Sequence, residues 1–375
     1  MEEILDFIDP VNKLAINEDI DFIDGQYGHS MKIYDTDFPD LSEVDIVILG
    51  IPEMRGTGNN RESKNSPDAV RKQLYKLHTW HPDLTIADIG NIKRGAQLND
   101  TYFALQKTLE ELIRQNKSVV IIGGSHDLTL AQYNAYKGMN QIIEATGIDA
   151  FIDLKNESNI RNENFLLEML TGEPNMIKHY NHIGFQSYFV HPRLIETMDK
   201  LRFDCFRVGR VKEQIEEMEP VIRNSQLVSF DVSSLKNSAA PANLFSTNGF
   251  NGEEACILSQ YSGMSTQLTS FGIYGFDTSL DQNDLTAKQI AQMIWYFIDG
   301  QSKKRNEAAL SESAHYIEYH TFFAEVETLF LQNKKTKRWW MQMPDKKFIP
   351  CSINDYLTAS NNEMPERWLR TQERG

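Results

Sequence analysis

The chain has 375 residues, of which 41% are hydrophobic and 24% charged, a balance typical of a soluble globular protein with one large or two ordinary domains. Its formal net charge of −15 argues against a nucleic-acid partner, because phosphate binding needs a basic face. No apolar run is long enough to span a membrane, and the acidic N-terminus does not resemble a secretory signal. The cysteines Cys205, Cys256 and Cys351 are widely spaced, so we expect a cytoplasmic protein with reduced thiols, and one disulfide is the alternative.

The first elements indicate an arm followed by an α/β pattern. Residues 1–43 show no clear period, and we expect them to form an N-terminal arm on the main domain. Residues 44–50 are a short β-branched run, typical of a buried parallel strand. Ser66-Pro67 places a cap residue before proline, which predicts the start of a helix. A helix over residues 99–116 then leads into a second buried strand over residues 118–124.

The middle of the chain continues this alternation. Apolar runs predict strands over residues 148–154, 182–185, 226–232 and 270–276, and helix-like stretches cover 127–138, 252–262 and 285–299. Strands alternating with helices predict a three-layer α/β/α domain with a parallel sheet, which we expect over residues 44–305. In such sheets the chemistry lies at the carboxyl ends of the strands.

The last part of the chain differs in character. Residues 306–375 are rich in large aromatic side chains, including Trp339-Trp340, and contain a basic run at 334–338. Such a segment is typical of a small packed subdomain, and we expect an aromatic-rich C-terminal extension.

Several motifs lie at the expected strand ends and helix starts. They are Ile48-Leu49-Gly50-Ile51-Pro52, Ser66-Pro67-Asp68-Ala69-Val70-Arg71, Gly123-Gly124-Ser125-His126-Asp127, Ile152-Asp153-Leu154-Lys155-Asn156-Glu157, Ser229-Phe230-Asp231-Val232-Ser233 and Ala240-Pro241. In this order they resemble the ureohydrolase family of arginase, agmatinase and formimidoylglutamase. The resemblance covers about residues 44–300 and implies the arginase-like fold.

The family centre holds two Mn²⁺ ions between two histidines and four aspartates, and a bridging hydroxide attacks a guanidino or formimino carbon. Its second aspartate-rich motif is D-A-H-x-D, which we place on residues 153–157. On that placement His126, Asp153 and Asp231 keep the family identities, Glu157 replaces an aspartate, Lys155 replaces the second histidine and Ser233 replaces the fourth aspartate. Both losses fall on the same ion.

Charge counting leads to a one-ion hypothesis. Three buried carboxylates would shift toward protonation without a cation. One Mn²⁺ held by four side chains, together with the Lys155 ammonium in place of the second ion, would bring the cluster to neutrality. The ligands would be His126, Asp153, Glu157 and Asp231. The alternatives are a metal-free site with shared protons, a Lys155 that points to solvent, and strand-end aspartates that only cap backbone amides.

Two further family positions have changed. The glutamate of the family's E-V-N-P motif, which grips the cationic substrate group, corresponds to Gly275, and the proton-shuttling histidine before Gly-x-Pro corresponds to Thr171. We therefore do not expect ordinary family catalysis and assign no catalytic residue.

The first functional hypothesis is a non-catalytic ureohydrolase-fold protein with a binding or assembly role. The resemblance implies a homo-oligomer, and the C-terminal extension offers a surface for a protein partner. The alternative is a one-metal amidinohydrolase acting on a formimidoylglutamate-like or other linear C–N substrate. A third possibility is a small-molecule sensor that keeps the pocket without the chemistry.

Overall fold

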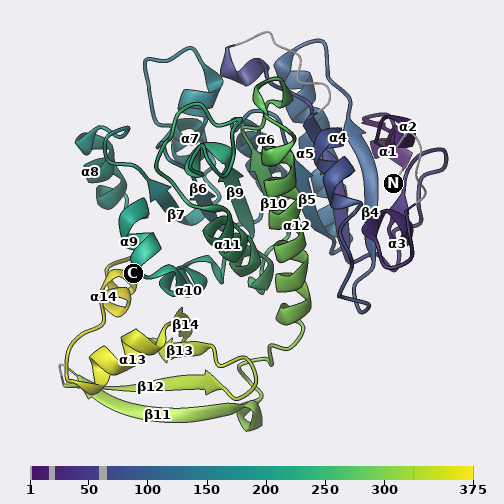
Figure 1. Cartoon of the computed structure of the whole chain (residues 1–375). Coiled ribbons are helices and arrows are strands. Elements are labelled where there is room, and N and C mark those ends of the chain that lie inside the picture. Colours follow the sequence, from purple (N-terminus) through teal and green to yellow (C-terminus); the bar gives the residue numbers. More distant parts are fainter. Residues whose placement is uncertain (1, 17–21, 59–65, 324, 375) are drawn as a thin grey trace.

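The computed structural model describes residues 2–16, 22–58, 66–323 and 325–374. A large sheet of ten strands lies at the centre of the main domain (Figure 1), with the order β1-β4-β3-β5-β10-β9-β6-β7-β8 and β2 beside β4. Its pairings are parallel except for β1 with β4. The strands are β1 (Ile8–Asp9), β2 (Lys32–Ile33), β3 (Ile46–Gly50), β4 (Ile86–Ile92), β5 (Ser118–Ile122), β6 (Ile143–Ile148), β7 (Ile177–Phe185), β8 (Asp204–Arg207), β9 (Leu227–Asp231) and β10 (Ser270–Tyr274).

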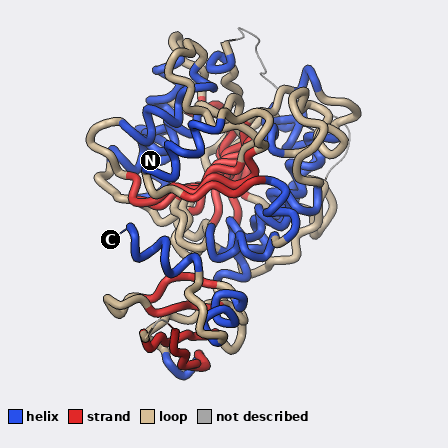
Figure 2. The backbone as a smooth tube through the Cα atoms, turned by 90° about the vertical axis from the view of Figure 1, so that its left-hand side faces the viewer, coloured by secondary structure: helices blue, strands red, loops and turns tan. Residues whose placement is uncertain are grey.

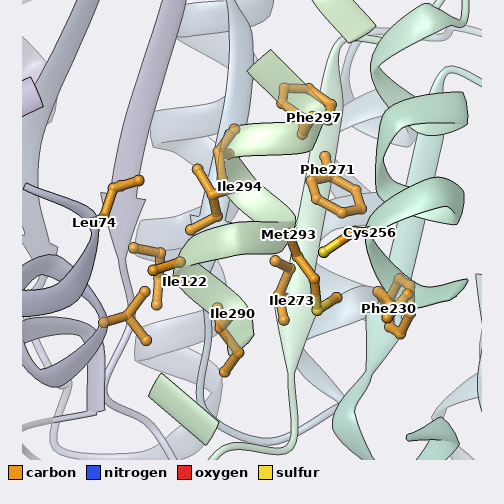
Figure 3. Close-up of a cluster of buried hydrophobic side chains, with 14 of the residues drawn as sticks. Leu74, Ile122, Phe230, Cys256, Phe271, Ile273, Ile290, Met293, Ile294 and Phe297 are labelled. Carbon is orange, nitrogen blue, oxygen red and sulfur yellow. The ribbon is translucent and has the colours of Figure 1, made fainter. Parts of the chain in front are cut away.

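Helices cover both faces of this sheet (Figure 2), which confirms the expected three-layer arrangement. On one face lie α4 (Ser66–Leu74), α11 (Gly252–Met264) and α12 (Leu285–Lys304), and on the other α5 (Leu98–Arg114), α6 (Leu128–Gly138) and α7 (Arg161–Thr171). Alternate residues of β3 enter opposite cores, Ile46 and Ile48 on the α12 side and Val47 and Leu49 on the α5 side. Figure 3 shows the α12 side, where Phe297 packs on Phe271 with ring centroids 4.7 Å apart.

The remaining elements of the main domain are short. The N-terminal segment contains α1 (Glu2–Leu5), α2 (Lys13–Ile16) and α3 (Tyr27–Ser30), and β1 and β2 both pair with β4. Beyond β7 follow α8 (Pro192–Lys200), α9 (Val208–Glu213) and α10 (Met218–Ile222). No helix in the described ranges is long and apolar enough to cross a membrane.

One predicted strand is misplaced, and this matters for the site. The run at residues 148–154 is not a strand, because β6 ends at Ile148 and the loop at the carboxyl end of the strand begins with Asp149. β6 contains Glu144, Thr146 and Gly147, so it is less apolar than the loop that follows it. Hydrophobicity therefore indicated the loop rather than the strand. The runs at 44–50, 118–124, 226–232 and 270–276 do contain strands, namely β3, β5, β9 and β10.

The C-terminal extension forms a separate antiparallel sheet below the main domain in Figure 1. Its strands are β11 (Tyr316–Phe323), β12 (Val326–Asn333), β13 (Trp339–Gln342) and β14 (Phe348–Cys351), followed by α13 (Ile353–Ser360) and α14 (Glu366–Arg374). Phe323, Phe330, Trp339 and Trp368 belong to its own small core, as the aromatic composition suggested.

A buried ion network joins the extension to α10. Glu219 of α10 accepts hydrogen bonds from Arg223 Nε at 3.0 Å and from Arg338 Nε at 2.8 Å. Arg223 also donates to the carbonyl of Trp339 at 2.6 Å and lies over the Trp340 ring. Burial alone would raise the pKa of Glu219, but the charges of Arg223 and Arg338 lower it to about 2. The extension is thus held to the main domain by paired charges.

Candidate metal centre

His126 is placed by the glycine turn that follows β5. A side chain at Gly124 would meet the backbone oxygen of Glu53 at 1.8 Å, so the close approach of these two segments requires glycine. The imidazole is buried, and its Nε2 lies 2.9 Å from the hydroxyl of Ser229 on β9. That hydroxyl is itself 2.6 Å from Thr129 Oγ1. The ring is therefore held by one nitrogen, and the other, Nδ1, is directed elsewhere.

Three carboxylates surround Nδ1 of His126. The nearest oxygens of Asp149, Asp153 and Asp231 lie 3.1, 3.3 and 3.6 Å from it. Asp149 is the first residue after β6, Asp153 follows in the same loop, and Asp231 ends β9. Despite these short distances, no described residue is aligned to form a hydrogen bond with Nδ1, which is buried. An unsatisfied nitrogen among carboxylates is the arrangement expected of a metal site.

The electrostatics of the cluster point the same way. Burial raises the pKa of Asp153 well above its ordinary value, with the charge of Asp149 adding to the effect, and burial raises the pKa of Asp231 to about 6. Burial alone would lower the pKa of His126, but the charge of Asp231 and contact with Asp149 and Asp153 raise it well above its usual range. Without a cation, this cluster therefore binds protons that the same groups would release in water.

These side chains fit one divalent cation. Within the described residues, His126, Asp149 and Asp153 offer ligand atoms that all lie within 4.8 Å of one another. Asp231 faces the same nitrogen from the neighbouring strand. One imidazole nitrogen and three carboxylate oxygens suit an ion such as Mn²⁺.

The cluster corrects the placement of the D-A-H-x-D motif. Asp149-Ala150-Phe151-Ile152-Asp153 fits that motif four residues earlier than we expected, and it lies at the end of β6. Asp149, which the sequence analysis missed, takes the place assigned to Asp153, and Asp153 takes the place assigned to Glu157, which is exposed. Lys155 does not replace an ion either. Its side chain is 59% exposed and its ammonium pairs with Glu163 at 2.9 Å, because the loop has already turned away from the strand ends.

The two changed family positions are therefore Phe151 and Ser233. The hydroxyl of Ser233 donates a short hydrogen bond to Asp149 Oδ1, and its backbone nitrogen donates to Asp231 Oδ1 at 2.6 Å. The Phe151 ring stacks on Phe189 with centroids 4.8 Å apart. A phenyl ring has no lone pair to offer a metal, and the Ser233 hydroxyl is already engaged with a carboxylate.

Gly275 stands where the backbone excludes a side chain. Its φ is +80°, and a Cβ would lie 2.7 Å from Asp231 Oδ1. Its nitrogen donates to the carbonyl of Gly124 at 2.7 Å, which fixes β10 against the glycine turn. The family's glutamate would not fit here without a shift of the backbone.

Thr171 lies outside the cluster. It is the exposed last residue of α7, and its hydroxyl donates to the carbonyl of Leu167 at 2.7 Å. The residue of α7 that reaches His126 is Phe165, whose ring centroid is 4.8 Å from the imidazole. Thr171 therefore does not stand in for a proton shuttle.

Comparison with known proteins identifies the family. The model of the Arginase family matches residues 44–299, which is more than half of the chain. The chain belongs to the arginase family. Formimidoylglutamase of Staphylococcus aureus (strain Newman) is 22% identical over 286 residues, which make up 70% of this chain and 90% of that protein. Formimidoylglutamase of Staphylococcus haemolyticus is 27% identical over 139 residues, 34% of this chain and only 43% of that relative.

Solved structures of arginase-family proteins share the fold. Formimidoylglutamase of Bacillus subtilis has a TM-score of 0.67 at 16% identity, covering 76% of this chain and 95% of that one. Formiminoglutamase of Trypanosoma cruzi, solved with Mn²⁺, has a TM-score of 0.64 at 17% identity, covering 72% of this chain and 100% of that one. At this identity the likeness shows the fold alone.

The C-terminal extension and the main domain enclose a groove that does not include the cluster. A groove of about 1720 Å³ separates β7 and β8 from the C-terminal extension. None of the four cluster residues lines it. Its charged residues include Asp204, which pairs with both Arg370 and Arg374. We place the chemistry at the carboxylate cluster, because there a buried ring nitrogen without a hydrogen-bond partner faces three carboxylates.

Proposed function

We propose that this protein binds a single divalent cation, Mn²⁺, at the carboxylate cluster and acts as a ligand-binding member of the arginase family rather than as a two-ion hydrolase. The ligands would be His126, Asp149, Asp153 and Asp231. The observation that carries the proposal is the buried Nδ1 of His126 facing three carboxylates.

The surroundings of the cluster support one ion rather than two. Two ions with a bridging water activate that water for attack, and each ion needs its own ligands. Phe151 and Ser233 occupy the positions that the family uses for the second ion, and neither offers a free anionic donor. Ser229 holds the imidazole so that Nδ1 faces the ion, and Ser233 holds Asp149 and Asp231 in place. A bound ion would supply a Lewis acid to one ligand oxygen or nitrogen.

A second candidate is a one-ion hydrolase of a linear C–N bond. The complete set of one histidine and three aspartates favours it, because a single ion can activate water in other enzymes. Gly275 restricts the substrate, since no carboxylate at this position is available for a cationic amidine. Such an enzyme would act on a neutral group, which differs from the guanidino compounds of the family.

Assembly remains part of the proposal. We infer a homo-oligomer from family membership, and the C-terminal extension offers a surface for a protein partner. The buried pairing of Glu219 with Arg338 supports this role, because it holds the extension in one orientation on the main domain. Light scattering at several protein concentrations would test it, and a strict monomer would count against it.

Metal analysis tests the proposal directly. After loading with Mn²⁺ and removal of excess ion, we expect close to one Mn²⁺ per chain and none in Asp149→Ala. Glu157→Ala, an exposed neighbour of the loop, is the matched control and should keep the ion. Two ions per chain would contradict the proposal. Hydrolysis of a linear substrate with a neutral reacting group, such as an N-formyl amide, that disappears in Asp231→Ala would select the enzyme alternative.

A further inference from the structure

Three aromatic rings meet beside the cluster, each from a different loop at the carboxyl ends of neighbouring strands. Phe151 follows β6, Phe189 follows β7 and Phe245 follows β9. Phe151 stacks on Phe189 at 4.8 Å with an interplanar angle of 18°, and it meets Phe245 edge-on at 5.6 Å. Phe151 is also the residue between the two aspartates of the cluster loop. The rings thus adjoin the candidate ion site rather than a distant surface.

A buried glutamine holds the three loops together. The backbone nitrogen of Gln186 donates to the carbonyl of Ala150 at 2.9 Å, which ties the β7 loop to the β6 loop. The side-chain amide of Gln186 donates to the hydroxyl of Ser246 at 2.8 Å, which ties it to the β9 loop. Both Gln186 and Ser246 are buried. The rings therefore stand on a fixed base, and little ordering is needed for them to bind a ligand.

The β9 loop is connected to the cluster by a second path. Asn243 donates to the carbonyl of Ser233 at 3.0 Å and accepts from the backbone nitrogen of Phe245 at 2.9 Å. The backbone nitrogen of Phe151 donates to Asp149 Oδ1 at 3.1 Å. Ser233 is thus connected through Asn243 to the loop of Phe245. Phe151 is connected directly to the candidate ligand Asp149.

The rings are exposed in a way that folding alone does not explain. Phe245 is 68% exposed, and Leu244, next to it in the sequence, and Tyr188, whose ring lies 4.7 Å from that of Phe189, are exposed as well. Contiguous exposed apolar groups commonly mark a binding surface. Ring faces preorganised in this manner recognise another ring by stacking or edge contacts.

We propose that Phe151, Phe189 and Phe245 form an aromatic subsite that selects ligands carrying an aromatic or bulky apolar group next to the atom that coordinates the ion. This inference rests on the proposed one-ion site and names the class of ligand that the site takes. Where the family motif has a histidine that binds the second ion, Phe151 would then provide an apolar contact to the ligand.

A pair of hydroxamates with the same chelating head tests the subsite. We would measure the binding of benzohydroxamate and acetohydroxamate to the Mn²⁺-loaded full chain by calorimetry. Burial of the phenyl group predicts that benzohydroxamate binds about tenfold more tightly than acetohydroxamate. Phe245→Ala should reduce this preference to about threefold or less, with acetohydroxamate binding unchanged. Phe189→Ala should do the same, and Phe245→Leu serves if the alanine variant does not fold.

The matched control is Phe322→Ala, which removes a phenylalanine of similar exposure, 61%, from β11 of the C-terminal extension. It should keep the tenfold preference. Equal binding of the two hydroxamates to the ion-loaded protein would overturn the aromatic subsite and leave the one-ion proposal standing. Absence of bound Mn²⁺ would overturn the one-ion proposal and the subsite with it. A change of oligomeric state in Phe245→Ala without a change in preference would show that the rings contact a second copy instead.

Discussion

Two buried clusters of charged residues in this protein differ in how their charges are balanced. Around Glu219, carboxylate and guanidinium groups alternate, Arg338 also pairs with Glu307 at 3.2 Å, and the pKa of Glu219 is lowered to about 2. Around His126, three carboxylates share one imidazole, and the pKa values of Asp153 and Asp231 are raised. The first cluster is balanced within the chain, whereas the second has one imidazole for three carboxylates.

This difference separates a structural role from a functional one. A buried charge with all of its partners is stable as it stands, and removal of one partner leaves an uncompensated ion. A cluster of unbalanced carboxylates is costly until a cation or protons arrive. Loss of a carboxylate should therefore lower the free energy of unfolding strongly in the Glu219 cluster and much less in the His126 cluster.

The largest effect is expected for Glu219→Gln. It leaves Arg223 and Arg338 buried without their shared carboxylate, and we expect the free energy of unfolding to fall by about 3–5 kcal/mol. Urea unfolding measures it. Glu366→Gln, which breaks only the exposed pair with Arg210, is the control and should change stability by less than about 1 kcal/mol. A loss of similar size in both variants would remove the contrast between paired and exposed charges.

Acid should destabilise the Glu219 network in a defined pH window. The pKa of Glu219 is lowered on folding from its ordinary value to about 2, so its contribution is fully present above about pH 4.5 and is lost as the pH falls toward 2. We expect a contribution of about 3 kcal/mol. The difference in unfolding free energy between wild type and Glu219→Gln should therefore shrink between pH 4.5 and 2. A difference that stays constant over this range would assign the loss to packing.

Mn²⁺ should stabilise the protein through the other cluster. At a free ion concentration of one hundred times Kd, binding to the folded chain adds about 2.7 kcal/mol. Differential scanning fluorimetry should show a rise in Tm for wild type and none for Asp149→Asn. In the absence of ion, Asp153→Asn should cost far less than Glu219→Gln, since burial and the charge of Asp149 already disfavour the ionised form of Asp153. An apo variant as unstable as Glu219→Gln would show that the cluster is structural.

Gly275→Ala should destabilise the chain by about 1–3 kcal/mol, because alanine is strained at positive φ and its Cβ would crowd the carboxylate of Asp231. Thermal unfolding with and without Mn²⁺ would detect it. Gly209→Ala is the matched control, since no atom lies within 4 Å of a Cβ there and φ is not positive. If Gly275→Ala leaves stability unchanged, the backbone at this position can accept a side chain. The backbone conformation would then not be the reason that the family's substrate-binding glutamate is missing.

The smallest effect is expected for Lys155→Ala. The ammonium pairs with Glu163 at the surface, and such pairs contribute little, so stability should change by no more than about 0.5 kcal/mol. Mn²⁺ content should be the same as in wild type by metal analysis. Loss of ion binding in this variant would show that Lys155 contributes to the ion site.

Much of the fold follows from local patterns. Buried parallel strands such as β3 and β5 are short β-branched runs, and both are recognisable one segment at a time because β3 ends in Gly50 and β5 is followed by Gly123. His126 was found for the same reason, because a glycine turn between a strand and a helix is a local signal. The aromatic composition of the C-terminal extension likewise indicated a separate core.

The remainder of the site depended on where a strand ends. Residues 149–153 and 153–157 both place acidic residues four apart, so spacing could not choose between Asp149 and Glu157. Pairing of β6 with β7 and β9 decides it, because that pairing ends β6 at Ile148 and brings Asp149 beside His126. The sequence by itself determined the family fold and indicated His126, Asp153 and Asp231 as candidate ligands. Only the tertiary structure decided that Asp149 joins them, that Lys155 faces solvent and that Phe151 meets rings from two other loops, because these contacts join segments far apart in the chain.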